Sequence, residues 1–290
     1  MTMQARKSSA NYERTLTDQQ FSILTKLAHD KAGLMISESK RQMIESRLVR
    51  HLRSIECHDV NEYFSSFQHD ASGEAENALI SVLTTNVSSF FRENHHFETV
   101  EKDVLPLLRT KVGNKGKVRI WSAGCSTGQE PYSIAMLLLD RAPELANADL
   151  RILGTDIDRT VLARAKSGIY RNDEVSTIPS KFRSRFLAGR SGEFRVTEDV
   201  RRLVSFRPLN LIDEWPMKGR FDIIFCRNVV IYFSSATQLQ LWPRFHAALE
   251  PNGYFFLGHS ERISDAVNAG YTARGVTTYS KSETKIAKLR

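Results

Sequence analysis

The stretch that decides the fold of this chain reads VRIWSAGCSTGQEPYSIA, from Val118 to Ala135. It runs from an apolar strand through a turn of small residues directly into a helix. Gly124 and Gly128 allow the backbone to turn tightly and to approach a ligand, and Pro131 suits an early helical position because its missing N–H is harmless there. This order of strand, turn and helix is typical of nucleotide-binding domains.

The next predicted strand supplies a second feature of such domains. Leu150–Thr155 ends at Asp156, and an acidic side chain there can accept hydrogen bonds from both ribose hydroxyls of a nucleotide. For the glycines alone, an ordinary strand-to-helix turn is an equally good interpretation, but the turn and Asp156 together favour a nucleotide site. Because the turn reads GCSTGQ and lacks the GxGxxG of nicotinamide-cofactor folds, it favours S-adenosylmethionine.

Composition limits the class of protein. With 290 residues, 41% of them hydrophobic, the chain can bury a substantial core in one large domain or two unequal ones. No apolar run approaches the roughly 20 residues that span a bilayer, and the first residues lack a signal-peptide core, so we expect a cytoplasmic protein without membrane insertion. Cys57, Cys125 and Cys226 lie far apart and outside metal-ligand spacing, so neither a disulfide framework nor a metal ion is expected.

The net charge of +8 favours an acidic partner. Charge alone leaves nucleic acid, a membrane surface and an acidic protein open. Nucleic-acid binding would be favoured by aromatic residues between basic ones or by an RNA-binding motif, and the sequence shows neither. We therefore expect no nucleic-acid partner.

The first part of the chain, from Thr17 to about Leu83, is predicted to be helical. Thr17 can cap a first helix that stops at Gly33. Further helices are predicted for Ser37–Ile55, Val60–Gln68 and Glu74–Leu83.

The second of these helices has two distinct faces, one apolar and one basic. A solvated charged surface is the ordinary interpretation of such a run of arginines, and a docking surface for an acidic partner is the alternative. The apolar face carries Ile44, Leu48, Leu52 and Ile55, and the basic face carries Arg47, Arg50 and Arg53.

After a predicted connecting helix over Asn94–Lys111, the composition changes at Lys117. Apolar runs then alternate with helical segments, which is the pattern of a parallel sheet with helices on its faces. Phe221–Cys226 is apolar almost throughout and is predicted as a central strand buried on both sides. Between Gly168 and Arg202, a hairpin-like segment, FLAGRSGEFRV, predicts a small inserted subdomain. The predicted strands are VRIWSA, DLRILGTD, LVSFRPLN, FDIIFCRN, GYFFLGHS and VTTYSK.

Ligands of open α/β sheets bind at the carboxyl ends of the strands, so the residues that follow each strand are candidate site residues. Asn228 also suits a role in shaping the turn after its strand. His95, His96 and His259 lie near these segments but are assigned no catalytic role. The candidates are Glu130, Asp156, Asn210, Leu211, Arg227, Asn228 and Tyr232.

Five motifs resemble the chemotaxis receptor methyltransferase family, CheR. They are TTNVSSFFRE (84–93), SAGCSTGQEPYSIA (122–135), GTDID (154–158), FCRNVVIYF (225–233) and GHSE (258–261), in the order found in that family. The resemblance extends from about Leu16 to Ser280. It implies an α/β fold: a Rossmann-like S-adenosylmethionine-dependent methyltransferase domain with a small inserted β-subdomain, preceded by an all-α N-terminal domain.

The resemblance also implies a division of the chain. We expect a disordered tail over residues 1–15, a helical receptor-docking domain over 16–85, an interdomain linker and helix over 86–116, and the S-adenosylmethionine-binding methyltransferase domain over 117–283. Within that domain, the β-subdomain is expected at about 168–203.

The implied activity is methylation of glutamate side chains on the cytoplasmic helices of chemoreceptors, with S-adenosylhomocysteine as the second product. A glutamate carboxylate is already nucleophilic at neutral pH, so its attack on the sulfonium methyl needs no general base. Arg92 and Tyr232 are the expected catalytic residues, while Ser88 stands where the family commonly has Thr and keeps the hydroxyl. The expected cofactor-binding residues are Asn86, Ser88, Arg92, Gly124, Glu130, Asp156, Asn210, Leu211, Cys226, Arg227 and Asn228.

The family also suggests how the partner binds. Its helical domain approaches the acidic methylation region of the receptor, so Arg47, Arg50 and Arg53 are the expected docking residues. Some members hold a tether peptide from the receptor C-terminus on a β-subdomain with a longer glycine-containing loop. The compact AGRSGE loop here favours a form that does not rely on the tether. We separately expect the protein to be a monomer.

Other assignments stay open at this point. Arg92 could bridge the two domains, and Tyr232 could be a packed aromatic residue at a strand end. A small-molecule or RNA methyltransferase could use the same sheet, although N-methylating RNA enzymes often carry an Asn/Asp-Pro-Pro-Tyr tetrad where this chain reads Arg-Asn-Val-Val. A non-catalytic chemosensory adaptor that binds the cofactor is a further alternative, which the presence of Arg92 and Tyr232 disfavours.

Overall fold

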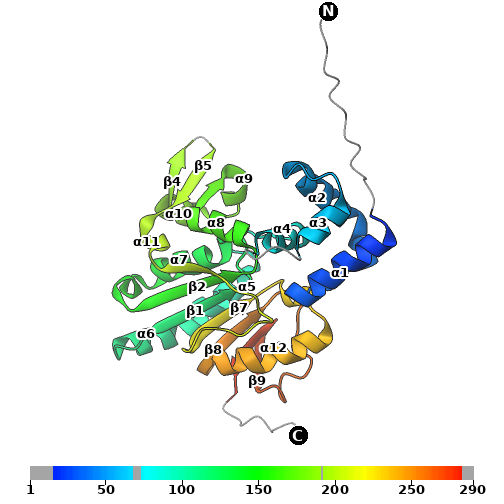
Figure 1. Ribbon diagram of the computed structural model, residues 1–290. Coiled ribbons are helices and arrows are strands. Elements are labelled where there is room, and N and C mark those ends of the chain that lie inside the picture. Colours follow the sequence, from blue (N-terminus) through cyan, green and yellow to red (C-terminus); the bar gives the residue numbers. More distant parts are fainter. Residues whose placement is uncertain (1–15, 68–72, 191, 283–290) are drawn as a thin grey trace, which may run out of the picture. The chain divides into compact units, whose positions relative to one another are not determined.

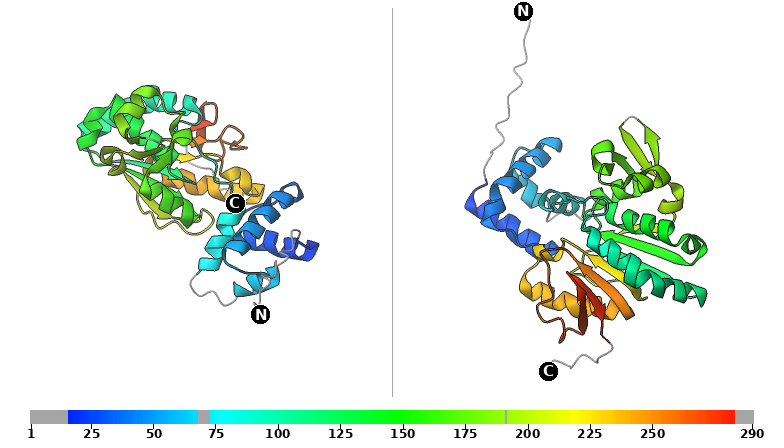
Figure 2. Two further views of the ribbon diagram at one scale, coloured as in Figure 1. Left: turned by 90° about the horizontal axis from the view of Figure 1, so that it is seen from above. Right: turned by 180° about the vertical axis from the view of Figure 1, so that it is seen from behind.

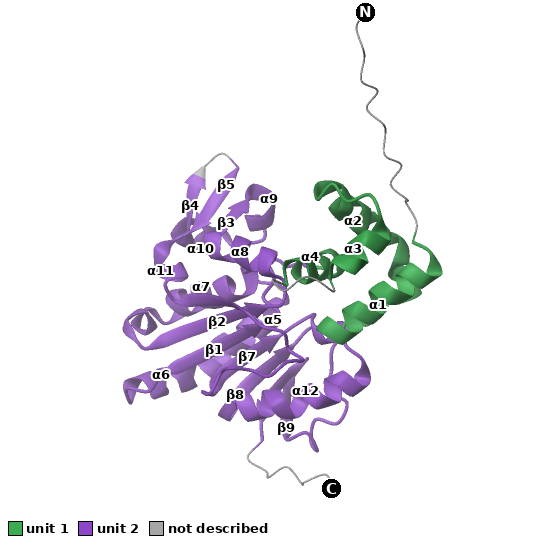
Figure 3. Cartoon of the chain, viewed as in Figure 1, with its two compact units in different colours: residues 1–85 green, residues 86–290 purple. Residues whose placement is uncertain are grey.

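The computed structural model describes residues 16–67, 73–190 and 192–282. The chain divides into two compact units, Met1–Thr85 and Asn86–Arg290 (Figure 3). The segment expected to be a disordered tail, residues 1–15, lies outside the described residues, as does Ser191 of the AGRSGE loop.

The described part of the first unit consists of helices. Helix α1 begins after Thr17, whose side chain accepts a hydrogen bond from the Gln20 N–H while the Gln20 side chain accepts one from the Thr17 N–H. It ends at Gly33, where φ is 68°, so the predicted cap and stop are confirmed. The apolar faces share a core around Leu24 and Leu48. The elements are α1 Asp18–Ala32, η1 Glu38–Lys40 (a 3₁₀ turn), α2 Arg41–Ser54, α3 Val60–Ser66 and α4 Glu74–Leu83.

The prediction that Ile55 shares the apolar face of α2 is wrong. The helix ends at Ser54, and Ile55 is its C-cap with φ −104° and ψ 9°. Because this backbone has left the helical geometry, the helical periodicity no longer places the Ile55 side chain, which is 47% exposed. Ile44, Leu48 and Leu52 are buried as predicted.

The second unit is built on a seven-stranded sheet in the order β6-β2-β1-β7-β8-β10-β9 (Figure 1). The first five strands of this order are parallel, whereas β10 runs antiparallel to both β8 and β9. Ile223, Ile224 and Phe225 of the middle strand are fully buried, as predicted for a central strand. The strands are β1 Val118–Ala123, β2 Leu150–Asp156, β6 Val204–Pro208, β7 Phe221–Cys226, β8 Leu249–Leu257, β9 Tyr271–Gly275 and β10 Thr278–Lys281.

Helices cover both faces of this sheet (Figures 1 and 2). Phe255 and Phe256 are successive residues of β8, so their rings point to opposite faces. The Phe255 ring lies 4.9 Å from that of Phe245 in α12, and the Phe256 ring lies 5.2 Å from that of His96 in α5. The helical elements are α5 Asn94–Thr99, the π-helix η2 Val100–Val104, α6 Leu105–Gly113, α7 Gln129–Arg141, η3 Pro143–Asn147, α8 Arg159–Ser167, α11 Glu198–Arg201, η4 Val230–Tyr232 and α12 Ser235–Ala248.

The inserted subdomain is confirmed as a separate three-stranded antiparallel sheet in the order β3-β5-β4. Its elements are β3 Ile169–Arg171, α9 Asn172–Val175, α10 Ser180–Phe186, β4 Leu187–Arg190 and β5 Glu193–Val196.

Two strands differ from the prediction. Strand β8 begins at Leu249, before the predicted GYFFLGHS, and β9 was not predicted. Four of the five residues of β9 are exposed, so it has no apolar alternation to reveal it. Of the described helices, none is both long and apolar enough to cross a membrane.

Candidate functional site

The turn between β1 and α7 requires its glycines. Gly124 has φ 78° and Gly128 has φ 94°, a region that side-chain-bearing residues rarely adopt. A Cβ on Gly124 would lie 2.3 Å from the Cγ2 of Val229, and one on Gly128 would lie 2.9 Å from the Cβ of Ala165. The sequence therefore dictates a tight turn that packs closely against Val229 and Ala165.

Asp156 ends β2 beside this turn. One of its carboxylate oxygens accepts from the Ser126 N–H at 2.8 Å and the other from the Asp158 N–H at 3.0 Å. The residue is 7% exposed, and burial raises the pKa of its carboxyl to about 6, although the two backbone hydrogen bonds act in the opposite direction. Each oxygen keeps acceptor capacity, so Asp156 can accept two further donors such as ribose hydroxyls.

Glu130, in the first turn of α7, forms a buried ion pair with Arg227, which follows β7. The Arg227 Nε donates to Glu130 Oε2 at 2.6 Å, and the Ser122 hydroxyl donates to Glu130 Oε1 at 2.6 Å. The exposed fractions of the two charged side chains are 2% for Arg227 and 10% for Glu130. Strand β1, helix α7 and the segment after β7 thus meet at one polar cluster.

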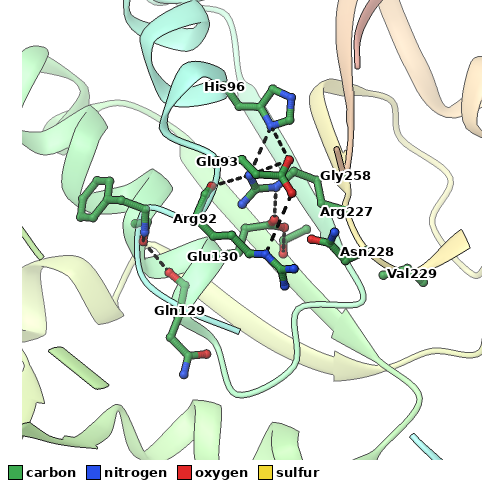
Figure 4. A network of polar contacts seen from close by, with 12 residues as sticks. Arg92, Glu93, His96, Gln129, Glu130, Arg227, Asn228, Val229 and Gly258 are labelled. Carbon is green, nitrogen blue, oxygen red and sulfur yellow. Dashed lines mark hydrogen bonds and ion pairs between the residues drawn. The ribbon is translucent and has the colours of Figure 1, made fainter. Parts of the chain in front are cut away.

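Arg227 also fixes the segment that carries Arg92. Its Nη1 donates to the Arg92 carbonyl at 2.5 Å and lies 3.2 Å from His96 Nδ1 (Figure 4). Phe91 and Glu93, on either side of Arg92, have φ of 53° and 55°. Positive φ at such residues is strained and persists only where surrounding contacts hold it. The network therefore holds an unusual backbone around Arg92.

The Arg92 side chain keeps donors available. Its Nη1 donates to the Val87 carbonyl at 3.1 Å, and its Nε lies 4.0 Å from a Glu93 carboxylate oxygen. The side chain is 34% exposed. A guanidinium has five N–H donors, so this geometry leaves several for an anionic ligand.

His96, Glu93 and Asp158 were not predicted as site residues. His96 is buried, and desolvation together with the nearby Arg227 lowers its pKa to about 3, so the ring is neutral and its Nδ1 can accept from Arg227. Glu93, His95 and His96 place possible metal-ligand atoms within 4.8 Å of one another. The Arg227 Nη1 lies 3.8 Å from Glu93 Oε2, so a guanidinium already supplies positive charge there.

The predicted Asn86 is built into the same turn. Its Nδ2 donates to Asp158 Oδ2 at 2.8 Å, and its carbonyl accepts from the Ser126 hydroxyl at 2.9 Å. Asp158 in turn caps α8 by accepting from the Thr160 N–H. An aspartate directly before a helix was the signal in the sequence that could have identified this residue. Ser88 is partly buried on the same segment.

The remaining strand-end candidates end or follow β6 and β7. Cys226 is fully buried, and burial raises the pKa of its thiol, so its backbone is the part that can meet a ligand. Asn228 has φ 59° and shapes the turn after β7. Asn210 Oδ1 accepts from the Ile212 N–H at 3.4 Å, and the Leu211 side chain is buried. Tyr232 ends η4 and is partly buried.

The predicted docking arginines lie in the first unit, on α2. Arg47 is partly buried and its Nη1 donates to the Thr84 carbonyl at 2.7 Å, so it stabilises the end of α4 within its own unit. Arg50 and Arg53 are exposed.

Comparison with known proteins gives two family matches. Residues 19–84 match the all-alpha domain of CheR methyltransferases, and residues 86–279 match their SAM binding domain. A probable chemotaxis protein methyltransferase of Rhizobium etli is 42% identical over 258 residues, covering 87% of this chain and 96% of that protein. The chemotaxis protein methyltransferase of Escherichia coli is 39% identical over 274 residues, covering 92% of each chain.

Proposed function

Because this chain belongs to the CheR methyltransferase family, we propose that it methylates glutamate side-chain carboxylates in the cytoplasmic part of chemoreceptors. The family and its relatives make the chain a chemotaxis methyltransferase with an S-adenosylmethionine-binding domain. The acceptor, a glutamate carboxylate that becomes a methyl ester, is the proposed part.

The residues at the carboxyl ends of the strands fit S-adenosylmethionine. Gly124 and Gly128 give their turn a left-handed backbone, and a side chain at either place would meet neighbouring atoms. Asp156 presents two carboxylate oxygens with acceptor capacity, which we assign to the ribose hydroxyls. We assign further contacts with S-adenosylmethionine to Asn86, Ser88, Arg92, Glu130, Asn210, Leu211, Cys226, Arg227 and Asn228.

The chemistry requires placement more than proton transfer. S-adenosylmethionine supplies a sulfonium methyl group, which a carboxylate oxygen attacks as the carbon–sulfur bond breaks and its electron pair stays on sulfur. The attacking carboxylate is ionised at neutral pH, so the protein has no proton to remove. Holding the two reactants at near-attack distance can lower the barrier by roughly 7 to 11 kcal/mol in favourable systems.

We assign this placement to Arg92 and Tyr232. The partly exposed Arg92 guanidinium can hold one face of the substrate carboxylate through charge-assisted hydrogen bonds, and the Tyr232 hydroxyl can orient it. The observation that carries the proposal is the fixed backbone of Arg92, bonded through its carbonyl to the buried Arg227–Glu130 pair.

An assay of the methylated product tests the acceptor. The protein is incubated with a receptor cytoplasmic fragment and methyl-labelled S-adenosylmethionine, and the product is then treated with alkali. Methyl esters hydrolyse and release labelled methanol, whereas N-methyl groups do not. Release of the label supports a carboxylate acceptor, and alkali-stable label in the fragment contradicts it.

We also propose that the exposed Arg50 and Arg53 on α2 dock the acidic methylation region of the receptor. Arg47 contributes through the stability of its unit, because its guanidinium is bonded to the end of α4. For the tether peptide we keep the prediction that this chain does not rely on it. Titration of the isolated peptide tests this, and micromolar binding would contradict the prediction.

A further inference from the structure

A buried carboxylate outside the predicted site collects four backbone N–H groups. Glu261 follows β8 after a short turn and is 3% exposed. Its Oε1 accepts from Val229 at 2.8 Å and Ile231 at 3.2 Å, and its Oε2 accepts from Asn228 at 2.8 Å and Gly258 at 2.6 Å.

The charge of this carboxylate is balanced by backbone dipoles. Among the described residues, Glu261 forms no salt bridge with a basic side chain. Burial raises the pKa of its carboxyl, and the hydrogen bonds from the backbone act in the opposite direction. A buried charge is costly unless hydrogen bonds compensate it, so a residue needed only to fill space here would be apolar.

The four bonds tie two chain segments together. Three of them go to the loop Asn228–Tyr232 after β7, and the fourth goes to Gly258 at the end of β8. The segments are in close contact, since a Cβ on Gly258 would lie 2.6 Å from the Asn228 nitrogen. Asn228 itself has φ 59°, a left-handed conformation that these contacts help to hold.

The loop that Glu261 holds touches both parts of the transfer site. Val229 packs against the Gly124 turn so closely that a methyl group at position 124 would lie 2.3 Å from its side chain. Ile231 immediately precedes Tyr232 in η4. One carboxylate is therefore bonded to the loop that carries both the contact with the Gly124 turn and Tyr232.

We propose that Glu261 is a positioning residue for methyl transfer, which places Tyr232 relative to the Gly124 turn through the loop Asn228–Tyr232. This inference rests on the proposed function. The effect of Glu261 passes through the backbone of Val229 and Ile231, which its carboxylate holds.

The test compares Glu261→Gln with Glu250→Gln. The first change keeps the shape but replaces one acceptor oxygen with an NH₂ that faces two backbone N–H groups. The second makes the same chemical change near the start of β8, at a partly exposed residue whose carboxylate lies 3.6 Å from Lys111. We expect Glu261→Gln to lower kcat for receptor methylation by about threefold to tenfold, no more than loss of the Tyr232 hydroxyl itself, with KM for S-adenosylmethionine much less affected. Glu250→Gln should match the wild type.

A second readout separates this inference from the proposed function. Fluorotyrosine is incorporated into the full chain, and the Tyr232 fluorine NMR resonance is assigned by its absence in Tyr232→Phe. The resonance should shift or broaden in Glu261→Gln and stay unchanged in Glu250→Gln. If the wild type methylates no receptor glutamate, the proposed function fails while this measurement still tests the positioning role.

Two results would overturn the inference: a wild-type kcat in Glu261→Gln, or an unmoved Tyr232 resonance. If Glu261→Gln does not fold, Glu261→Asp carries the test, because it keeps the charge and withdraws it from the loop. A folded Glu261→Asp variant with wild-type kcat and resonance would likewise reject the positioning role.

Discussion

At the scale of single residues, the ion pair Glu130–Arg227 is best explained by its role in positioning neighbouring backbone. Both side chains are nearly buried. A buried ion pair gains little net stability, because desolvation of the two charges offsets much of their attraction. The pair is also bonded to the Ser122 hydroxyl and to the Arg92 carbonyl. We infer that its main effect is to hold the strained backbone around Arg92.

Substitution of the two proposed catalytic residues tests their roles. Arg92→Ala removes charge-assisted donors at the reacting carboxylate and should lower kcat/KM by about 10² to 10³, as for other lost transition-state donors. Tyr232→Phe removes one neutral hydrogen bond and should lower kcat by about tenfold or less. Steady-state methylation of a receptor fragment measures both effects. Unchanged turnover with normal cofactor binding would remove both residues from the mechanism.

The binding of S-adenosylhomocysteine should depend on pH through Asp156. Burial raises the pKa of this carboxyl to about 6, and ribose hydroxyls need the ionised form as acceptor. Protonation on the acid side should therefore weaken binding, by about tenfold between about pH 7 and about pH 5. Calorimetric titration over this range measures the effect. Asp156→Asn is the control, with weaker binding and no such step, and an affinity of the wild type that does not change with pH would contradict the assignment.

At the scale of elements, the sequence predicted those helices and strands that depend on residues close together in the chain. Helix α1 follows from the Thr17 capping box and the left-handed Gly33, and β7 follows from its unbroken apolar run. Strand β9 escaped prediction because it is an exposed antiparallel edge strand without apolar alternation. Its position depends on pairing with β10, which its own residues do not encode.

The same distinction applies to the candidate site. The sequence predicted Asp156, Glu130 and Arg227 as candidate site residues, because ligands of open α/β sheets bind at the carboxyl ends of the strands. Each of the three ends or follows a recognisable strand or opens a helix. The contact between Arg227 and the Arg92 carbonyl joins residues 135 positions apart, and only the folded sheet reveals it. Glu261 lay in a quoted motif, but its bonds to the loop after β7 depend on two strands that are neighbours in space.

The Gly124 turn gives a prediction for one element. Gly124→Ala adds a methyl group against Val229 at φ 78°, so it should weaken S-adenosylhomocysteine binding by about tenfold or more, given a left-handed cost of about 1–2 kcal/mol plus the clash. The double variant Gly124→Ala, Val229→Ala removes the clash but not the backbone cost and should recover part of the affinity. Binding of the single variant equal to wild type would show that the turn tolerates a side chain.

At the scale of the whole molecule, the net charge of +8 suits an acidic partner. If Arg50 and Arg53 dock the receptor, KM for the receptor should rise with salt, because the screening length falls from about 10 Å at about 0.1 M to about 3 Å at about 1 M. The affinity for S-adenosylhomocysteine should change much less. Methylation assays over a salt series measure this, and a KM for the receptor that does not change with salt would argue against electrostatic docking.

Charge-reversal variants test whether Arg50 and Arg53 cause the salt dependence of KM for the receptor. The pair Arg50→Glu, Arg53→Glu should raise KM for the receptor and weaken its salt dependence, while kcat stays near wild type. Lys26→Glu, an exposed position on α1 of the same unit, is the control for a change of charge alone. An equal rise of KM in the control would move the docking surface away from α2.

The central claim is that this chain esterifies glutamate carboxylates of a chemoreceptor. Mass spectrometry of a receptor cytoplasmic fragment, after incubation with S-adenosylmethionine and the full chain, tests it most directly. We expect peptides whose modified residue is glutamate to gain the mass of one CH₂ group. Treatment with alkali should remove this added mass, and Arg92→Ala should strongly reduce it. Methyl groups on lysine, arginine or any alkali-stable position, with glutamate unmodified, would contradict it.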